Sequence, residues 1–281
     1  MKTVPIQSKI LRFVIIVGFV LGTVVLSGKM TVTGFTESTE QAAAEITPLR
    51  IMPLGDSITA GYTDNPIWEH PFEFGYRSGL YRRMKKAGYD FVFVGESEEP
   101  FNKRFGDPTH GGSVVPKFDL RKPGQDSHRG YGGWGIGSIQ KNVAGWIKQD
   151  RPEIILLLIG INGINTESPM QLDALVKTIY DADSDVKLII AQITPLNKYN
   201  QNLFDYNTYI RQTLVPAYNG KGYTINTVDL YKHFLTNPDD PKSIDAAFLS
   251  NKINHPTNPL YDKMAESWFQ GIESLLTNEK Q

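Results

Sequence analysis

Short apolar runs that alternate with amphipathic stretches, from Leu49 onward, are the feature that most restricts the fold of this chain. Five runs are rich in Ile, Leu, Val or Phe, and each begins or ends beside Gly, Pro or Asp, as strands do: Leu49–Leu54, Asp90–Val94, Glu153–Ile159, Val186–Ile193 and Tyr223–Val228. The third run is almost entirely Ile and Leu, which predicts a central strand buried on both faces.

The stretches between these runs carry Leu or Ile at spacings of three and four residues, which predicts helices. They are Tyr76–Ala87, Gly137–Gln149, Met170–Asp181, Leu203–Tyr218 and Leu260–Leu276. Strands that alternate with helices form a parallel sheet covered on both faces. The sequence therefore predicts an α/β fold, a flavodoxin-like three-layer α/β/α sandwich with a five-stranded parallel sheet, in one domain over residues 48–278.

The N-terminal segment has a different character. A run of fourteen uncharged residues, Phe13–Leu26, follows three basic residues, Lys2, Lys9 and Arg12. This order is typical of a secretory leader, and the run is short of the ~20 residues of a full membrane span. Residues 1–30 are thus predicted to be a signal peptide or an uncleaved membrane anchor, and residues 31–47 a polar linker. Either alternative predicts an extracytoplasmic protein, secreted or anchored, with membrane contact only through the anchor.

Charge and residue content exclude several classes of protein. A formal net charge of −1 gives no field that would attract phosphate backbones, so we expect no nucleic-acid partner. The absence of cysteine excludes disulfides, thiolate metal sites and a cysteine nucleophile. The histidines outside the C-terminal region, His70, His110, His128 and His233, show no paired spacing, so we expect neither a metal nor a cofactor. The oligomeric state stays open.

The first predicted strand ends in Leu54-Gly55-Asp56-Ser57, which puts a serine just past the carboxyl end of a parallel strand. Open α/β sheets bind their ligands there. A glycine turn can project the serine hydroxyl into the crevice while neighbouring N–H groups stabilise an oxyanion. The tripeptide alone is weak evidence, because Asp, Ser and Gly are common in ordinary turns. The long Gly- and Pro-rich stretch Glu96–His128 is expected to form a loop over the active site.

Four blocks in order along the chain resemble the SGNH, or GDSL, hydrolases: Ile51–Thr59, His128–Trp134, Ile159–Ile164 and His255-Pro256. Within that superfamily, Phe74-Gly75-Tyr76-Arg77 and the Gly-Trp of the second block look most like carbohydrate esterase family three, whose members include acetylxylan esterases. The resemblance covers the chain from Leu49 to about Leu276.

The resemblance implies a role for each block. Ser57 would be the nucleophile and His255 its general base. The oxyanion hole would consist of the Ser57 N–H, the Gly133 N–H, with Gly132 as the alternative, and the side-chain amide of Asn162. The implied reaction is the removal of acetyl or other short acyl groups, with an acylated carbohydrate, a polysaccharide above all, or another small ester as substrate.

Two positions depart from the family pattern. Lys252 stands where an Asp normally orients the histidine, and Gly163 stands where the third block usually has Asp. The imidazole could instead be oriented by Asn251 or a backbone carbonyl, or by an acid from elsewhere such as Asp245, or the activity could be reduced. Two rival functions follow: a noncatalytic carbohydrate-binding relic of the fold, and a lipase or lysophospholipase on the same scaffold.

Overall fold

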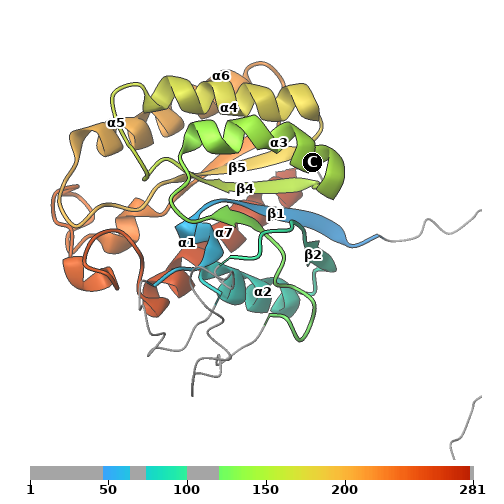
Figure 1. Ribbon diagram of the computed structural model, residues 1–281, viewed down its shortest axis with the longest axis horizontal. Coiled ribbons are helices and arrows are strands. Elements are labelled where there is room, and N and C mark those ends of the chain that lie inside the picture. The colour runs from blue at the N-terminus through green and yellow to red at the C-terminus, as the bar shows by residue number, and fades with distance from the viewer. Residues whose placement is uncertain (1–46, 64–73, 100–119, 279–281) are drawn as a thin grey trace, which may run out of the picture. The chain divides into compact units, whose positions relative to one another are not determined.

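A parallel sheet runs through the middle of the molecule (Figure 1). The computed structural model describes residues 47–63, 74–99 and 120–278. These residues contribute six strands: β1 (Leu49–Asp56), β2 (Phe91–Phe93), β3 (Arg129–Tyr131), β4 (Ile154–Leu158), β5 (Lys187–Gln192) and β6 (Ile225–Asp229). The strand order is β2-β1-β4-β5-β6, and β3 pairs with β1 outside this path. Every pairing is parallel, so all carboxyl ends lie along one edge of the sheet.

The sixth strand corrects the predicted count of five. β2 pairs only with the first half of β1, and β1 continues two residues past its predicted end, to Asp56. The backbone groups of this extension need partners, and β3 provides them by pairing with Leu54–Asp56. Because β3 is Arg-Gly-Tyr, with no apolar run, hydrophobic periodicity gave no signal for it.

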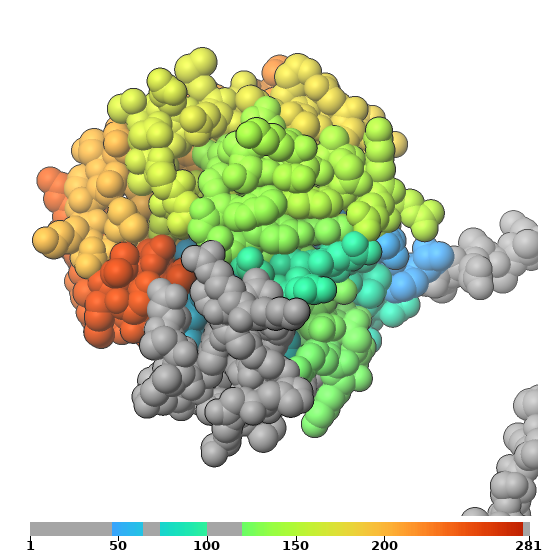
Figure 2. All heavy atoms as spheres, in the orientation of Figure 1, coloured from blue at the N-terminus to red at the C-terminus, as the bar shows by residue number. Residues whose placement is uncertain are grey.

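Helices cover both faces of the sheet, as predicted. In Figure 1, α3 to α6 lie on one face, and α2 and α7 lie on the other. Their bounds are α2 Tyr76–Lys86, α3 Ile136–Asp150, α4 Ser168–Ala182, α5 Gln201–Tyr209, α6 Val215–Asn219 and α7 Asn258–Asn278; three shorter elements are α1 Ser57–Ala60, η2 Tyr231–Phe234 and η3 Ala246–Phe248. In the space-filling view, α3 and α4 form one continuous surface over the sheet (Figure 2).

The predicted helix Leu203–Tyr218 forms in three pieces. A π-helical turn, η1 (Ile210–Leu214), separates α5 from α6. Pro216 has no N–H to donate to the carbonyl four residues earlier, which breaks the regular hydrogen-bond ladder at this point. Sequence periodicity does not distinguish such a turn from an unbroken α-helix, because the apolar spacing hardly changes.

The core confirms the predicted central strand, since every side chain of β4 is buried. Helices α3 and α4 pack their apolar faces against one side of the sheet, and Trp268 of α7 is completely buried on the other side. The predicted three-layer α/β/α sandwich is thereby confirmed.

The strand order reverses at β1. The chain runs from β1 to β2 on one side and later enters β4 on the other. At such a switch point, an open α/β sheet leaves a crevice outside the carboxyl ends of the two strands, and ligands bind there. The fold therefore places its natural binding crevice beside the ends of β1 and β4, where Ser57 begins α1.

The described residues belong to a compact unit that begins at residue 46. The predicted leader or anchor, the predicted linker up to residue 46, and the larger part of the loop predicted over the site lie outside the described residues. No helix within residues 47–63, 74–99 and 120–278 is both long and apolar enough to cross a membrane.

Candidate active site

Ser57 is held at a tight junction between β1 and α1. The carboxylate of Asp56 caps the short helix by accepting a hydrogen bond from the Ile58 N–H at 2.9 Å. Gly55 allows β1 and β4 to approach closely here, since a Cβ at this position would lie 2.0 Å from the Leu158 carbonyl oxygen. The local sequence thus fixes the serine at the mouth of the crevice.

The Ser57 hydroxyl contacts the His255 imidazole. The distance from Oγ to Nε2 is 2.7 Å, and both residues are buried, with 5% and 8% of their surface exposed. In the tautomer that carries its proton on Nδ1, Nε2 accepts the hydroxyl proton. The structure therefore brings together the two residues that the sequence pairs as nucleophile and base, across 198 positions of the chain.

A tight loop supports His255 through its backbone. The side-chain oxygen of Asn251 accepts hydrogen bonds from the N–H groups of Ile253, Asn254 and His255, at 2.9 to 3.0 Å. The His255 carbonyl in turn accepts the Ser250 N–H at 2.7 Å. Asn251, one of the candidates for orienting the imidazole, thus fixes the backbone that carries the ring.

The other residues considered for the orienting role lie differently. Lys252 is exposed, occupies the left-handed region with φ of 60°, and its carbonyl accepts from Asn197. The carboxylate of Asp245 caps the short helix η3 by accepting the Ala247 N–H at 2.8 Å.

A tyrosine that the sequence did not single out packs against the imidazole. Tyr62 is buried and its ring stacks on that of His255, with 5.8 Å between centroids and 19° between planes. Its hydroxyl donates to Glu99 at 3.0 Å, and its carbonyl accepts from the Tyr261 hydroxyl at 2.7 Å. The hydroxyl and the backbone of Tyr62 are therefore both anchored, and the fixed ring limits how far the imidazole can tilt.

The glycine loop after β3 distinguishes the two glycines that are candidates for donating an N–H to the oxyanion. The Gly132 N–H donates to the carboxylate of Glu99, so it is already engaged. Gly133 is exposed and has φ of 76°, a left-handed conformation that favours glycine, and a Cβ there would meet nothing within 4 Å. Of the two, Gly133 is the one with open space beside it.

Asn162 lies beyond the end of β4, and Gly133 beyond the end of β3. Because β3 and β4 flank β1 on its two sides, these residues follow the strands on either side of Ser57. The Asn162 amide donates one hydrogen bond to the Trp134 carbonyl at 3.0 Å, which joins the two loops. An amide nitrogen carries two hydrogens, so one remains for a further acceptor.

Arg77 supports the nucleophile turn from α2. Its fully buried guanidinium donates to the carbonyls of Thr59 and Ala60, both at 3.1 Å, and of Asp126 at 2.6 Å. Burial lowers the pKa of Arg77 to about 10, which still leaves it charged at neutral pH. The C-terminal carbonyls of the four-residue helix α1 are thus satisfied by a charge from a neighbouring element.

Burial also determines the direction in which the pKa is shifted for two titratable groups near the site. The pKa of Asp56 is raised from 3.8 to about 7 by desolvation, although the Ile58 N–H and the nearby His255 favour the charged form. Desolvation holds the pKa of His128 well below its usual value. His128 accepts the Gly130 N–H at Nδ1 and lies 2.8 Å from the Glu99 carbonyl at Nε2, as expected of a structural histidine.

Glu99 and Tyr62 are site-supporting residues that the sequence did not reveal, and Arg77 belongs to a motif of the family resemblance that gave it no role. Glu99 is half-buried and accepts two hydrogen bonds, whereas its neighbour Glu98 is exposed. Within the described part of the chain, no group of three or more His, Cys, Asp or Glu side chains is placed to hold a metal ion.

Fold and geometry together define an α/β protein with the SGNH hydrolase fold, with a serine and a histidine in hydrogen-bond contact at its switch point. No model of a known protein family matches the chain. A Clostridium thermocellum family 3 carbohydrate esterase superposes with a TM-score of 0.60 at 23% identity, covering 82% of this chain and 98% of that one. A mutant acetyl esterase structure with acetate gives a TM-score of 0.63 at 18% identity, with coverages of 82% and 99%. These likenesses confirm the predicted fold, and one of the two matched structures is a family 3 carbohydrate esterase.

One curated relative is also similar in sequence. A multidomain esterase of Ruminococcus flavefaciens is 28% identical over 256 residues, which cover 81% of this chain. The chain spans only 29% of the length of that relative. The similarity therefore concerns one part of a larger protein.

Proposed function

We propose that this chain is a serine ester hydrolase that removes acetyl or other short acyl groups from a polysaccharide outside the cytoplasm. The 2.7 Å contact between the Ser57 hydroxyl and His255 Nε2, at the switch point of the sheet, is the observation that carries the proposal. The relatives with this fold, a family 3 carbohydrate esterase and an acetyl esterase among them, support the choice of an ester bond.

The reaction would follow the order of serine hydrolases. Ser57 Oγ attacks the ester carbonyl while His255 Nε2 takes the hydroxyl proton. His255 then gives this proton to the leaving alcohol. The alcohol departs, and the acyl group stays bound to Ser57. A water molecule, deprotonated by His255, releases the acid and restores the serine. The stacked ring of Tyr62 keeps the imidazole facing Ser57 through both proton transfers.

The negative charge on the carbonyl oxygen would be stabilised by three donors. These are the N–H of Ser57, the N–H of Gly133 and the side-chain amide of Asn162. Gly133 and Asn162 follow the strands on either side of β1, so their donors approach the oxygen from two directions. Donors that are fixed before the reaction stabilise the oxyanion without reorganisation.

In the proposed reaction, Asn251 would position the backbone of the general base. The position of the usual acid carries the exposed Lys252, and Asn251 fixes three consecutive N–H groups that lead to the imidazole. This arrangement fixes the backbone from which the imidazole extends.

The extracytoplasmic location is supported by the order of basic and apolar residues before position 30. A polysaccharide substrate is supported by the similarity to the family 3 carbohydrate esterase. A net charge of −1 agrees with a neutral or weakly charged substrate.

The test is hydrolysis of p-nitrophenyl acetate by the purified chain. Ser57→Ala should reduce the rate to the background, because no other group can form the acyl intermediate, while Ser138→Ala, at an exposed position of α3, should leave the rate unchanged. A fluorophosphonate probe should label the wild type and not Ser57→Ala. Equal rates in wild type and Ser57→Ala would refute the proposal, and glycan binding without labelling would indicate the noncatalytic relic. Rates that rise with acyl chain length would instead indicate a lipase.

A further inference from the structure

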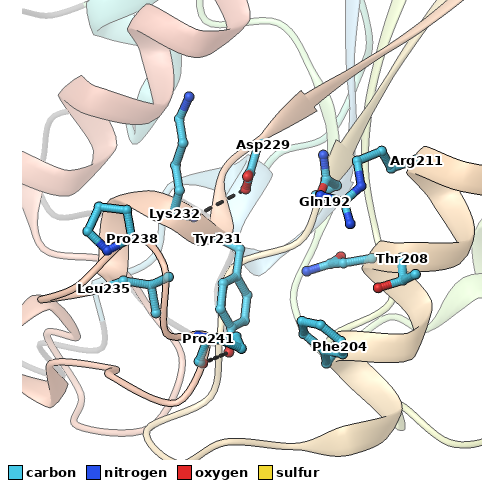
Figure 3. Close-up of a pocket in the computed structure, with 11 residues that line it drawn as sticks. Gln192, Phe204, Thr208, Arg211, Asp229, Tyr231, Lys232, Leu235, Pro238 and Pro241 are labelled. Carbon is cyan, nitrogen blue, oxygen red and sulfur yellow. Dashed lines mark hydrogen bonds between the residues drawn. The ribbon is translucent and has the colours of Figure 1, made fainter.

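We infer that a second site, at the carboxyl ends of β5 and β6, binds a neutral sugar ring. A cavity of about 250 Å³ opens there, between α5 with its π-helical turn η1 and the segment that follows β6. Figure 3 shows residues from these elements facing one another across it. The cavity lies along the same sheet edge as Ser57, with β4 between the two sites.

Gln192 provides the first evidence for a ligand. It is the last residue of β5 and is only 7% exposed, and its side-chain amide makes no hydrogen bond within residues 47–63, 74–99 and 120–278, although it is not sealed from the cavity. Its donors and acceptor are therefore available to a polar ligand that enters the cavity. The amide lines the cavity.

Two charged side chains line the same space. Asp229 ends β6 directly opposite Gln192 in the sheet register, and its Oδ1 accepts the Lys232 N–H at 3.2 Å. Arg211 extends from η1 toward Gln192 (Figure 3). No ion pair joins Arg211 to Asp229 in the described parts of the chain. Single π-helical turns often mark functional sites, and this one carries the guanidinium.

Aromatic rings form the sides of the cavity. Phe204 and Tyr231 lie on opposite sides of it in Figure 3, and the Tyr231 hydroxyl is fixed by a 2.8 Å hydrogen bond to the Pro241 carbonyl. A sugar ring presents apolar C–H faces to such walls, and its hydroxyls both donate and accept. An amide, a carboxylate and a guanidinium together match neighbouring hydroxyls.

The charges and the volume favour a single neutral ring. Arg211 and Asp229 balance each other, and the amino group of Lys232 points away from the cavity (Figure 3). An anion would meet the carboxylate of Asp229. A space of about 250 Å³ lies below the ~300 to 1,000 Å³ of drug-sized pockets, so it suits one ring of a sugar chain, with the other rings outside the cavity.

The position of this site along the sheet edge would let it hold a polysaccharide substrate near Ser57. Strands are spaced by ~4.8 Å, so the ends of β5 and β6 lie roughly 10 to 15 Å along the sheet edge from the end of β1. A polysaccharide held by one ring at Gln192 could present a substituent of another ring to Ser57. The role in substrate capture rests on the proposed function, whereas the binding itself does not.

The test measures binding to a chain that cannot hydrolyse esters. Full-length Ser57→Ala is titrated by calorimetry with unacetylated xylohexaose and cellohexaose. We expect at least one of them to bind, and we expect Arg211→Ala and Gln192→Leu in this background each to weaken the affinity about tenfold, the loss of one hydrogen bond to a buried or charged group. Gln212→Ala, the exposed neighbour of Arg211 on η1, is the matched control and should bind as Ser57→Ala does.

Several results would overturn the inference: no binding of either oligosaccharide, equal affinity in all variants, or binding of glucuronate or inorganic phosphate alone, which would show an anion site. Thermal unfolding checks that each variant is folded. If Gln192→Leu is not, the exposed Arg211→Ala decides the test alone. Sugar binding that depends on Arg211, in a chain whose wild type hydrolyses no ester, would refute the proposed function and leave this site intact.

Discussion

Tyr62 and His255 are stacked, with their ring planes 19° apart and 5.8 Å between their centroids. The nucleophile lies on the Nε2 side of the imidazole, at 2.7 Å, and the phenol covers one of its faces. The histidine is thereby held by packing as well as by its hydrogen bond, in a site where the residue three positions before it is an exposed lysine.

Tyr62→Leu should lower kcat for p-nitrophenyl acetate about tenfold, because a freely tilting imidazole spends less time aligned with Ser57. Tyr62→Phe keeps the stacked ring and loses the hydrogen bond to Glu99, so it should retain most of the activity. Full pH–rate profiles of both variants check this. If Tyr62→Phe were as impaired as Tyr62→Leu, the hydroxyl and not the stack would be the important group.

Glu99→Ala should reduce kcat/KM by about tenfold, since the carboxylate that holds the Gly132 N–H and the Tyr62 hydroxyl is lost. Glu99→Gln keeps an acceptor oxygen at that place and should restore most of the rate. Glu98→Ala, the exposed neighbour, is the control and should behave as wild type. An equal loss in Glu98→Ala would show that the segment, not the carboxylate, matters.

Asn162→Ala should lower kcat by ~100- to 1,000-fold with little change in KM, the usual effect of removing one oxyanion donor. The hydrogen bond to the Trp134 carbonyl is lost as well, so thermal unfolding is measured alongside the steady-state kinetics. Asn142→Ala, at an exposed position of α3, serves as the comparison. A change confined to KM would place Asn162 in substrate binding instead.

Asp56 should make the stability of the chain depend on pH. Its pKa is raised from 3.8 to about 7 by burial, so between these values the folded chain keeps a proton that the unfolded chain releases. The protonated Asp56 therefore adds to the free energy of unfolding in full below about pH 4. This stabilisation, roughly 4 kcal/mol at most, is lost as the pH rises through about 7.

Asp56→Asn removes this titration and can still cap α1. The free energy of unfolding, measured by denaturant titration from pH 4 to pH 8, should fall less steeply in Asp56→Asn than in wild type. Asp239→Asn, at an exposed position, should follow the wild-type curve. Parallel curves for Asp56→Asn and wild type would show that the carboxyl does not titrate in this range.

The sequence was informative where a residue's place follows from strand periodicity or from an ordered motif. The run before Ser57 predicts a strand end, and a strand end in a parallel sheet predicts the crevice. Glu99 and Tyr62 follow no such rule, because their roles depend on contacts between segments that no period connects. β3 was missed for a related reason: the unpaired edge of β1, and not its own composition, makes it a strand.

The two groups in contact at the site lie 198 residues apart, and the later one directly precedes the helix that packs against α2. During synthesis the imidazole therefore emerges 198 residues after the serine. A nascent chain, or one cut before His255, holds a complete β1 and α1 but no base. Turnover thus reports that the whole α/β unit has folded. Loss of the residues from His255 onward should abolish the activity as completely as loss of the serine.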